Sequence, residues 1–231
     1  MKMRKNDLSG CGIVLSDQQL LQLDKLADYM VEYNKNVNLT RITEPDEITE
    51  KHYIDSILPL TMVDVPRGTN VIDVGAGAGF PSLPMKIYRP DLSFTLLDSS
   101  NKRVTYLDSA CKMLGIECET IHARGEEAGK DPKYREKYDF AVARAVAALN
   151  VLCEYCLPFV KVGGMFLALK GEKDETSDAE NAIKTLGGKI TEVKKYSLPG
   201  GDKRTLAVIK KISPTPPQYP RVSAKIAKKP L

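Results

Sequence analysis

A short apolar segment that leads directly into a glycine-rich turn constrains this chain more than any other feature. Residues 71–74 read VIDV, and residues 75–81 read GAGAGFP. Glycines let a chain turn sharply and bring its backbone close to a ligand, and a helix that starts there presents unpaired N–H groups. The sequence therefore predicts a strand, a tight turn and a helix, with a nucleotide-like ligand at the mouth of the turn.

The chain after residue 66 alternates between β-type runs and helical runs. We expect strands at about 70–74, 93–98, 117–122, 138–143, 164–169, 189–196 and 205–210, and helices at about 80–89, 101–114, 148–160 and 176–186. This alternation is typical of parallel strands joined by crossover helices, and the Pro-Gly-Gly loop at 199–201 predicts an antiparallel pair at the end of the sheet. The predicted fold class is α/β: a Rossmann-like, seven-stranded, mostly parallel sheet with an antiparallel last strand and helices on both faces.

The first 65 residues are predicted to form a helical cap. Ser16 and Gln19 have the spacing of a capping box, and the apolar residues that follow recur at helical spacing through Asn34. A second helix is expected at about residues 46–63. We therefore divide the chain into an N-terminal extension (1–65), a ligand-binding core (66–212) and a basic tail (213–231).

Composition bounds the class of protein. Hydrophobic residues make up 42% of the chain and charged residues 28%, and no apolar run approaches the roughly eighteen residues that cross a bilayer. No apolar stretch follows Lys2, Arg4 and Lys5, so no secretory signal is predicted. The 5 cysteines are an odd number and argue against a disulfide framework. These features predict a cytoplasmic protein without a membrane partner.

The sequence predicts no metal site. Cys153 and Cys156 are spaced like half of a zinc site, but no second pair and no suitably spaced histidine accompany them. We expect both thiols to lie on the buried face of a helix.

Positive charge gathers at the C-terminal end, although the formal net charge is only +4. From residue 210 onward the chain has no Asp or Glu, and its basic residues are Lys210, Lys211, Arg221, Lys225, Lys228 and Lys229. Such a segment either contacts a polyanion or is a solvated, disordered end.

Two carboxylates flank the glycine turn. The dinucleotide fingerprint GxGxxG would need glycine at position 80, where this chain has Phe80. Its spacing is GxGxG, formed by residues that include Gly75 and Gly77 and preceded by Asp73, which is placed to meet the amino group of a methionine moiety. Asp98 closes the next strand, where nucleotide sites place a carboxylate for ribose hydroxyls. The pattern favours S-adenosylmethionine over NAD.

Taken in order, the motifs resemble the small-subunit ribosomal RNA methyltransferase G family, also called glucose-inhibited division protein B, over nearly the whole chain. The motifs are Asn38-Leu39-Thr40, Lys51-His52-Tyr53-Ile54-Asp55-Ser56, the turn at 73–81, Leu96-Leu97-Asp98-Ser99 with Lys102-Arg103, Arg124-Gly125-Glu126-Glu127, Ala143-Arg144-Ala145, Leu169-Lys170-Gly171 and Lys228-Lys229-Pro230-Leu231. The resemblance implies a class I methyltransferase that transfers a methyl group from S-adenosylmethionine to N7 of a guanine in the decoding-region loop of 16S rRNA.

The resemblance also implies roles for single residues. It places Gly75 and Phe80 on the methionine side of the cofactor, Gly125 and Glu126 on the adenine side, and Arg144 beside it. Gly125 departs from the family, in which alanine is usual at this position, and residues 221–227 lack the expected glycine and proline.

The substrate side of the site is predicted less directly. Guanine N7 carries a lone pair and no proton, so the reaction requires alignment and no catalytic acid or base is expected. Arg144 is predicted to donate to the guanine O6 or to a phosphate; the alternative is an ion pair with Asp73 or Asp98. Contacts with RNA are predicted for Asn38, His52, Lys170 and Arg204. For His52 the alternative is a buried core histidine.

The expected partner is 16S rRNA or the small ribosomal subunit, bound by a monomer without a stable protein partner. Three alternatives remain open at this point. The chain could methylate a small molecule or a protein, could be an NAD-dependent oxidoreductase, or could be a ribosome-binding protein with a vestigial nucleotide fold.

Overall fold

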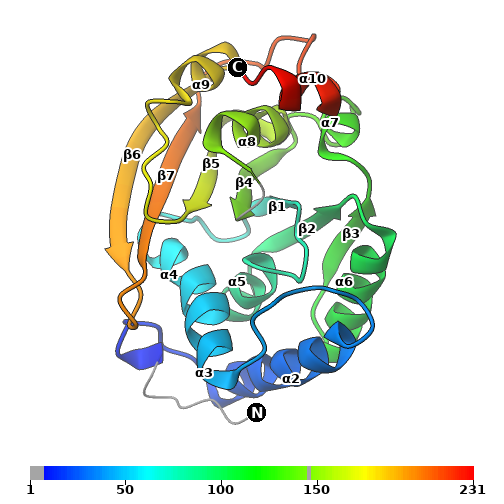
Figure 1. The fold of residues 1–231 in the computed structure, drawn as a ribbon, viewed down its shortest axis with the longest axis vertical. Helices are drawn as coiled ribbons and strands as arrows, with labels where there is room; N and C mark the ends of the chain where they lie inside the picture. The colour runs from blue at the N-terminus through cyan, green and yellow to red at the C-terminus, as the bar shows by residue number, and fades with distance from the viewer. Residues whose placement is uncertain (1–7, 145–146) are drawn as a thin grey trace.

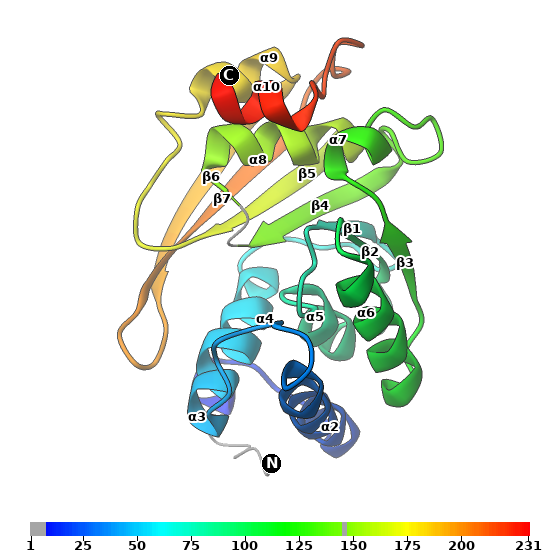
Figure 2. The same cartoon turned by 45° about the vertical axis from the view of Figure 1, so that its right-hand side comes forward.

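The computed structural model describes residues 8–144 and 147–231, so Lys2, Arg4, Lys5 and Ala145 lie outside the described residues. A single sheet runs through the middle of the molecule, with helices on both of its faces (Figures 1 and 2). Within the described part of the chain, no helix is long and apolar enough to cross a membrane.

The sheet has seven strands in the order β3-β2-β1-β4-β5-β7-β6. The strands are β1 (Asn70–Val74), β2 (Ser93–Asp98), β3 (Cys118–His122), β4 (Tyr138–Arg144), β5 (Val160–Lys170), β6 (Gly188–Ser197) and β7 (Lys203–Lys211). The first five strands in this order are parallel, and β7 runs antiparallel to both of its neighbours. The predicted fold class is confirmed.

The two faces of the sheet hold two hydrophobic cores, because side chains alternate along each strand. Phe140 and Val142 of β4 face one core, whereas Ala141 and Ala143 face the other. The first core is covered by α2 (Asp17–Asn34), α5 (Ser82–Tyr88) and α6 (Asn101–Leu114), and the second by α8 (Leu149–Cys156) and α9 (Glu180–Thr185). Figure 2 shows these two layers on opposite sides of the sheet.

The N-terminal extension begins as predicted and then departs from a regular helix. Ser16 and Gln19 form the capping box of α2. The second predicted helix consists of three consecutive pieces: α3 (Pro45–Glu47), the π-helix η1 (Ile48–Ile54) and α4 (Asp55–Thr61). Single π-turns inside helices occur frequently at functional sites, and this one carries His52.

The C-terminal segment is folded onto the core, so the alternative of a solvated, disordered end is wrong for these residues. It ends in a short helix, α10 (Ser223–Lys228), whose Ile226 is fully buried. Arg221 donates from its backbone and its guanidinium to the fully buried carboxylate of Glu154 on α8, at 2.6–2.9 Å for the three shortest contacts. Arg135 donates to the carbonyls of Thr215 and Tyr219 and holds the preceding loop.

Three predicted helices are shorter than expected, and the one predicted at 80–89 is α5, which loses only its ends. The helix predicted at 148–160 ends at Cys156, because Pro158 cannot continue it, and a 3-10 turn (Leu157–Phe159) follows. The helix predicted at 176–186 is α9, which begins at Glu180. The pattern also missed the four-residue helix α7 (Gly125–Ala128).

Candidate active site

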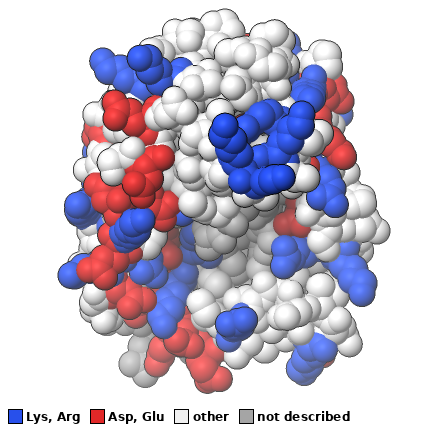
Figure 3. Space-filling model, turned by 45° about the horizontal axis from the view of Figure 1, so that its top comes forward, with Lys and Arg blue, Asp and Glu red and all other residues white. Residues whose placement is uncertain are grey.

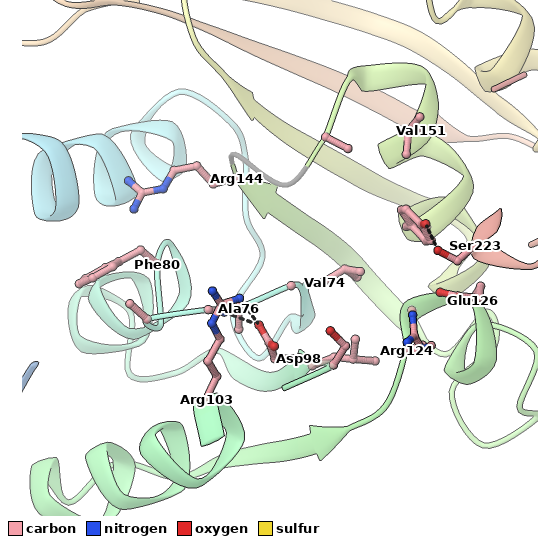
Figure 4. Close-up of a pocket in the computed structure, with 18 of the residues that line it drawn as sticks. Val74, Ala76, Phe80, Asp98, Arg103, Arg124, Glu126, Arg144, Val151 and Ser223 are labelled. Carbon is pink, nitrogen blue, oxygen red and sulfur yellow. Dashed lines mark hydrogen bonds and ion pairs between the residues drawn. The ribbon is translucent and has the colours of Figure 1, made fainter. Parts of the chain in front are cut away.

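A cavity of about 640 Å³ opens at the carboxyl ends of β1, β2 and β4. Seven of the eight residues predicted to hold the cofactor line it, together with one predicted RNA contact: Gly75, Gly77, Phe80, Asp98, Gly125, Glu126, Arg144 and His52. Figure 4 shows Phe80 and Arg144 at one end of this cavity and Glu126 and Ser223 at the other. We call this space the first cavity.

The glycine turn and Asp98 form one hydrogen-bonded unit. Strand pairing sets Val74 beside Leu97, so the turn after β1 meets the end of β2. The Leu97 carbonyl accepts from Gly75 N at 2.8 Å. The Asp98 carboxylate accepts from Gly77 N at 2.9 Å and from Ser100 N at 2.8 Å. A carboxylate has about four lone-pair sites, so Asp98 retains acceptor capacity toward the first cavity, which it also lines.

Two glycines of the turn differ in the space around them. Gly77 has φ +57°, and a Cβ there would meet nothing nearer than the Gly75 carbonyl at 3.8 Å. Gly79 has φ +87°, and a Cβ there would come within 2.4 Å of the Leu83 side chain. Gly77 therefore leaves open space for a ligand, whereas Gly79 permits the turn to pack on α5.

Asp73 is the one predicted cofactor residue that does not line the cavity. Its side chain is fully buried, one carboxylate oxygen accepts from the Ser82 hydroxyl, and the other has no partner among the described residues. Burial raises the pKa of Asp73 to about 7. The geometry does not support direct contact with a methionine amino group, because Asp73 does not line the cavity and its carboxylate holds Ser82, the first residue of α5.

Arg144 is bound to the N-terminal extension. Its Nη1 donates to the Lys51 carbonyl at 2.9 Å and to the Asp55 carboxylate at 3.2 Å. The other Asp55 oxygen accepts from Arg204 Nε at 3.0 Å, so this buried carboxylate bridges two arginines. The alternative ion pair of Arg144 with Asp73 or Asp98 is wrong, and its acidic partner is Asp55.

His52 is both a buried histidine and part of the cavity wall. It is 5% exposed, its ring stacks on Phe80 with centroids 4.0 Å apart, and its Nε2 lies 3.1 Å from the Thr40 hydroxyl. Arg144 Nη2 lies 3.3 Å from its Nδ1. Burial, and then the Arg144 charge, lower the pKa of His52 to about 3 against a smaller raising effect of the Lys51 backbone. The ring is therefore neutral near pH 7.

A second cavity of about 340 Å³ shares His52 and Arg144 with the first. Its other walls include Lys51, Asp55, Lys170 and Arg204. The Lys170 ammonium donates to the Ala147 carbonyl at 2.6 Å and pairs with Glu175 at 3.2 Å. The structure thus brings three of the four predicted RNA residues to this cavity. The fourth, Asn38, is exposed and lines neither cavity, whereas Leu39 and Thr40 line the first.

The far end of the first cavity combines two predicted residues with two that the sequence analysis did not identify. Gly125 and Glu126 begin α7 there, as the resemblance implied. Tyr155 of α8 and Ser223 of α10 complete the wall, with their hydroxyls 3.2 Å apart. No periodic or motif signal marks Ser223.

These observations fit an adenosine-containing ligand. The first cavity offers an open backbone approach at Gly77, a carboxylate with spare acceptor sites at Asp98, and apolar walls such as Leu97 and Val151. Among the described residues, no group of three His, Cys, Asp or Glu is arranged to hold a metal ion. Cys153 and Cys156 are buried free thiols.

The sheet order and the position of the cavity define the fold of the S-adenosylmethionine-dependent methyltransferases. A solved structure of M. jannaschii TYW2 in complex with AdoMet superposes with a TM-score of 0.56 at 15% identity, covering 74% of this chain and 80% of that one. A ribosomal protein L11 methylase from Lactobacillus delbrueckii subsp. bulgaricus gives a TM-score of 0.54 at 16% identity, covering 69% and 77%.

Sequence comparison gives the family. The model of the family described as rRNA small subunit methyltransferase G matches residues 19–206. A "Ribosomal RNA small subunit methyltransferase G" from Alkaliphilus metalliredigens is 48% identical over 229 residues, 96% of each chain. One from Acetivibrio thermocellus is 47% identical over 237 aligned residues, covering 100% of this chain and 98% of that one. The chain belongs to the rRNA small subunit methyltransferase G family, so the resemblance is confirmed and the oxidoreductase alternative falls.

Proposed function

We propose that this chain transfers a methyl group from S-adenosylmethionine to N7 of a guanine in the decoding-region loop of 16S rRNA, as a cytoplasmic monomer. The observation that carries the proposal is the junction of two cavities at His52 and Arg144. The first cavity has the features of a nucleoside site, and the second is lined by basic side chains, so a base entering through the second would meet the donor at the junction.

The first cavity would hold the cofactor between its two ends. Asp98 would accept the ribose hydroxyls, Gly125 and Glu126 would border the adenine, and Gly75 and Phe80 would border the methionine. When bound, S-adenosylmethionine supplies an electrophilic methyl group on a sulfonium. Phe80 is 6% exposed and stacks on His52, so its ring is a fixed apolar wall.

The chemistry at the junction favours an acceptor atom that has no proton to lose. The His52 ring is neutral near pH 7, but its Nδ1 lies against the Arg144 guanidinium and its Nε2 against the Thr40 hydroxyl. The Asp55 carboxylate is bound by two arginines. No described residue at the junction is therefore a free general base. N7 of guanine needs none, whereas an exocyclic amine would have to lose a proton.

Basic side chains around the first cavity would contact the RNA backbone. Arg103 and Arg124 line the cavity, and Lys225 and Lys228 are exposed on α10. Figure 3 shows a group of Lys and Arg side chains beside the hollow of this face. Phosphate contacts position RNA without specifying its sequence, so base choice would depend on the junction.

The test is transfer of labelled methyl groups to 30S particles, naked 16S rRNA and protein-free small-molecule extract in parallel. We expect label in ribosomal RNA, at a guanine whose N7 methylation is detected by borohydride reduction and aniline cleavage. Asp98→Asn should reduce incorporation at limiting cofactor by about tenfold or more, since it weakens a charge-assisted hydrogen bond. Asp108→Asn, which removes an exposed pair with Lys112 on α6, is the matched control.

Two results would refute this function. One is label confined to the extract, which would identify a small-molecule methyltransferase. The other is label on an exocyclic guanine amine, which would require a base that the junction does not provide.

A further inference from the structure

Thr40 lies in the loop between α2 and α3, and the side chain of Asn34 fixes the backbone of this loop beside the first cavity. Asn34, the last residue of α2, donates from its amide to the Thr40 carbonyl at 3.0 Å. Its amide oxygen accepts from the backbone of Leu39 at 2.8 Å and of Thr40 at 3.1 Å. The backbone N–H and carbonyl of Thr40 are thus both hydrogen-bonded. Thr40 lines the first cavity together with His52 and Phe80.

The direction of the hydrogen bonds along this wall is set by Arg144. A guanidinium can only donate, so Nδ1 of His52 must accept from Arg144 Nη2. The single proton of the neutral ring then lies on Nε2 and is donated to the Thr40 hydroxyl oxygen. The opposite tautomer would place an N–H of His52 against an N–H of Arg144.

The Thr40 oxygen has no lone pair left after these contacts. It accepts from His52 Nε2 at 3.1 Å and from Ile42 N at 3.1 Å. A hydroxyl has two acceptor sites and one donor, so its own hydrogen must point elsewhere. With His52 as the donor to this oxygen, no other hydrogen bond among the described residues uses that hydrogen, and Thr40 borders the first cavity.

We propose that the Thr40 hydroxyl is a donor of fixed polarity to an oxygen atom of the bound reactants, and hence a positioning and specificity residue of this site. The proposal rests on the function proposed above. Two reactant oxygens have the required chemistry: a carboxylate oxygen of the cofactor's methionine moiety, and O6 of the target guanine. In the second case adenine would be rejected, because its amino group would place a donor against this donor.

The test compares Thr40→Val, which removes the hydroxyl at nearly constant shape, with Thr40→Ser, which keeps it. Thr61→Val is the matched control, since Thr61 is exposed and donates only to the Leu58 carbonyl of its own helix. For each variant, calorimetry gives the Kd of S-adenosylmethionine and of its decarboxylated analogue, and methyl transfer gives kcat/KM for RNA. Thermal unfolding reports whether the fold is retained.

The two arms give different outcomes for Thr40→Val. If the acceptor is the carboxylate, the Kd of S-adenosylmethionine rises at least about tenfold while that of the decarboxylated analogue is unchanged. If the acceptor is O6, both Kd values hold and kcat/KM for RNA falls about three- to tenfold. In either arm Thr40→Ser and Thr61→Val remain near wild type. Equal values for Thr40→Val and wild type in all three measurements would overturn the proposal.

The tautomer of His52 can be measured on the wild-type protein, so this test does not depend on whether Thr40→Val folds. Nitrogen-15 chemical shifts of the His52 ring distinguish the two tautomers. The proton must be on Nε2, and finding it on Nδ1 would overturn the argument. Because neither this readout nor cofactor binding depends on RNA, failure of rRNA methylation would refute the proposed function separately.

Discussion

The two ends of the first cavity are closed by segments that lie outside the core of the sheet, and they are built differently. At the end beside the second cavity, the N-terminal extension contributes Thr40 and His52. At the other end, the C-terminal helix α10 contributes Ser223 and Ala227. The N-terminal extension brings a buried network of charges to its end, whereas α10 brings only small side chains to the other.

The difference indicates how function divides along the cavity. The network at the N-terminal end fixes hydrogen-bond directions where the base and the methyl group would meet. At the C-terminal end, the segment that leads into α10 is held by the pair between Arg221 and Glu154, neither of which lines the cavity. Changes at the first end should affect methyl transfer, together with cofactor affinity where they touch the methionine moiety, and changes at the second should affect cofactor affinity alone.

The largest effect should come from Arg144→Ala. It leaves Asp55 with one arginine and removes the donor that orients His52. We expect kcat/KM for rRNA methylation to fall at least about 100-fold, and the free energy of unfolding to fall by about 3 kcal/mol, as for other buried ion pairs that lose one partner. Arg144→Lys should recover part of the stability but not the activity, because an ammonium cannot reproduce the planar fork.

Arg89→Ala is the control for this variant. Arg89 also pairs with a carboxylate, that of Asp91, but it lies away from both cavities. Its removal should leave kcat/KM unchanged. If Arg144→Ala methylates rRNA at the rate of Arg89→Ala, the proposed division of the cavity does not hold.

At the other end, Arg221→Ala should loosen α10. It leaves the fully buried Glu154 carboxylate without its charged partner. An unpaired buried charge is costly, so a state in which α10 detaches and water reaches Glu154 becomes more favourable than the closed state. We expect the Kd of S-adenosylmethionine to rise about tenfold, while kcat at saturating cofactor stays within about twofold of wild type.

The paired variant Arg221→Met with Glu154→Leu tests the cause of that effect. Replacing a buried ion pair by apolar residues is often neutral for stability, so cofactor affinity should return. If the double variant binds as weakly as Arg221→Ala, the guanidinium itself contacts the cofactor and the wall is not merely positioned by the pair.

A change of pH should have a smaller net effect on the free energy of unfolding, because the titrations of two buried groups, His52 and Asp73, change it in opposite directions. The pKa of His52 is lowered to about 3, so its contribution to stability is present above the unfolded pKa of about 6.5 and is lost as the pH falls below it. The pKa of Asp73 is raised to about 7, so its contribution is present at low pH and is lost as the pH rises through 4 to 7. Between about pH 4 and 6.5 the two nearly cancel.

Single variants remove this cancellation. The stability of His52→Gln relative to wild type should increase by about 1.4 kcal/mol per pH unit as the pH falls from 6.5 toward 4. Asp73→Asn should show the opposite slope. Urea unfolding of both variants and of the wild type at several pH values measures these slopes. Parallel curves for His52→Gln and wild type would contradict the assigned pKa of His52.

Local signals predicted the fold and brought the glycine turn and Asp98 to one cavity, whereas Gly125, Glu126 and Arg144 were predicted only from the family resemblance. The glycine turn and Asp98 follow directly after strands, and parallel pairing brings those strand ends together. The partner of Arg144 could not be predicted in this way, because Asp55 is 89 positions distant and meets it only in the folded chain. Helix α10 was missed because it buries a single apolar residue, Ile226, and shows no periodic apolar pattern.

The smallest effect expected is that of Gly125→Ala, a change to the residue usual in the family. A Cβ at Gly125 would lie 3.4 Å from the Tyr155 ring and 3.4 Å from Val74, which both line the same end of the cavity. Alanine also favours the short helix α7 by up to about 1 kcal/mol over glycine. We therefore expect an unchanged or slightly higher unfolding temperature and a cofactor Kd within about twofold of wild type. A tenfold loss of affinity would show that this end of the cavity cannot accept even one added methyl group. Its fit to the cofactor would then be as strict as that of the end formed by Thr40 and His52.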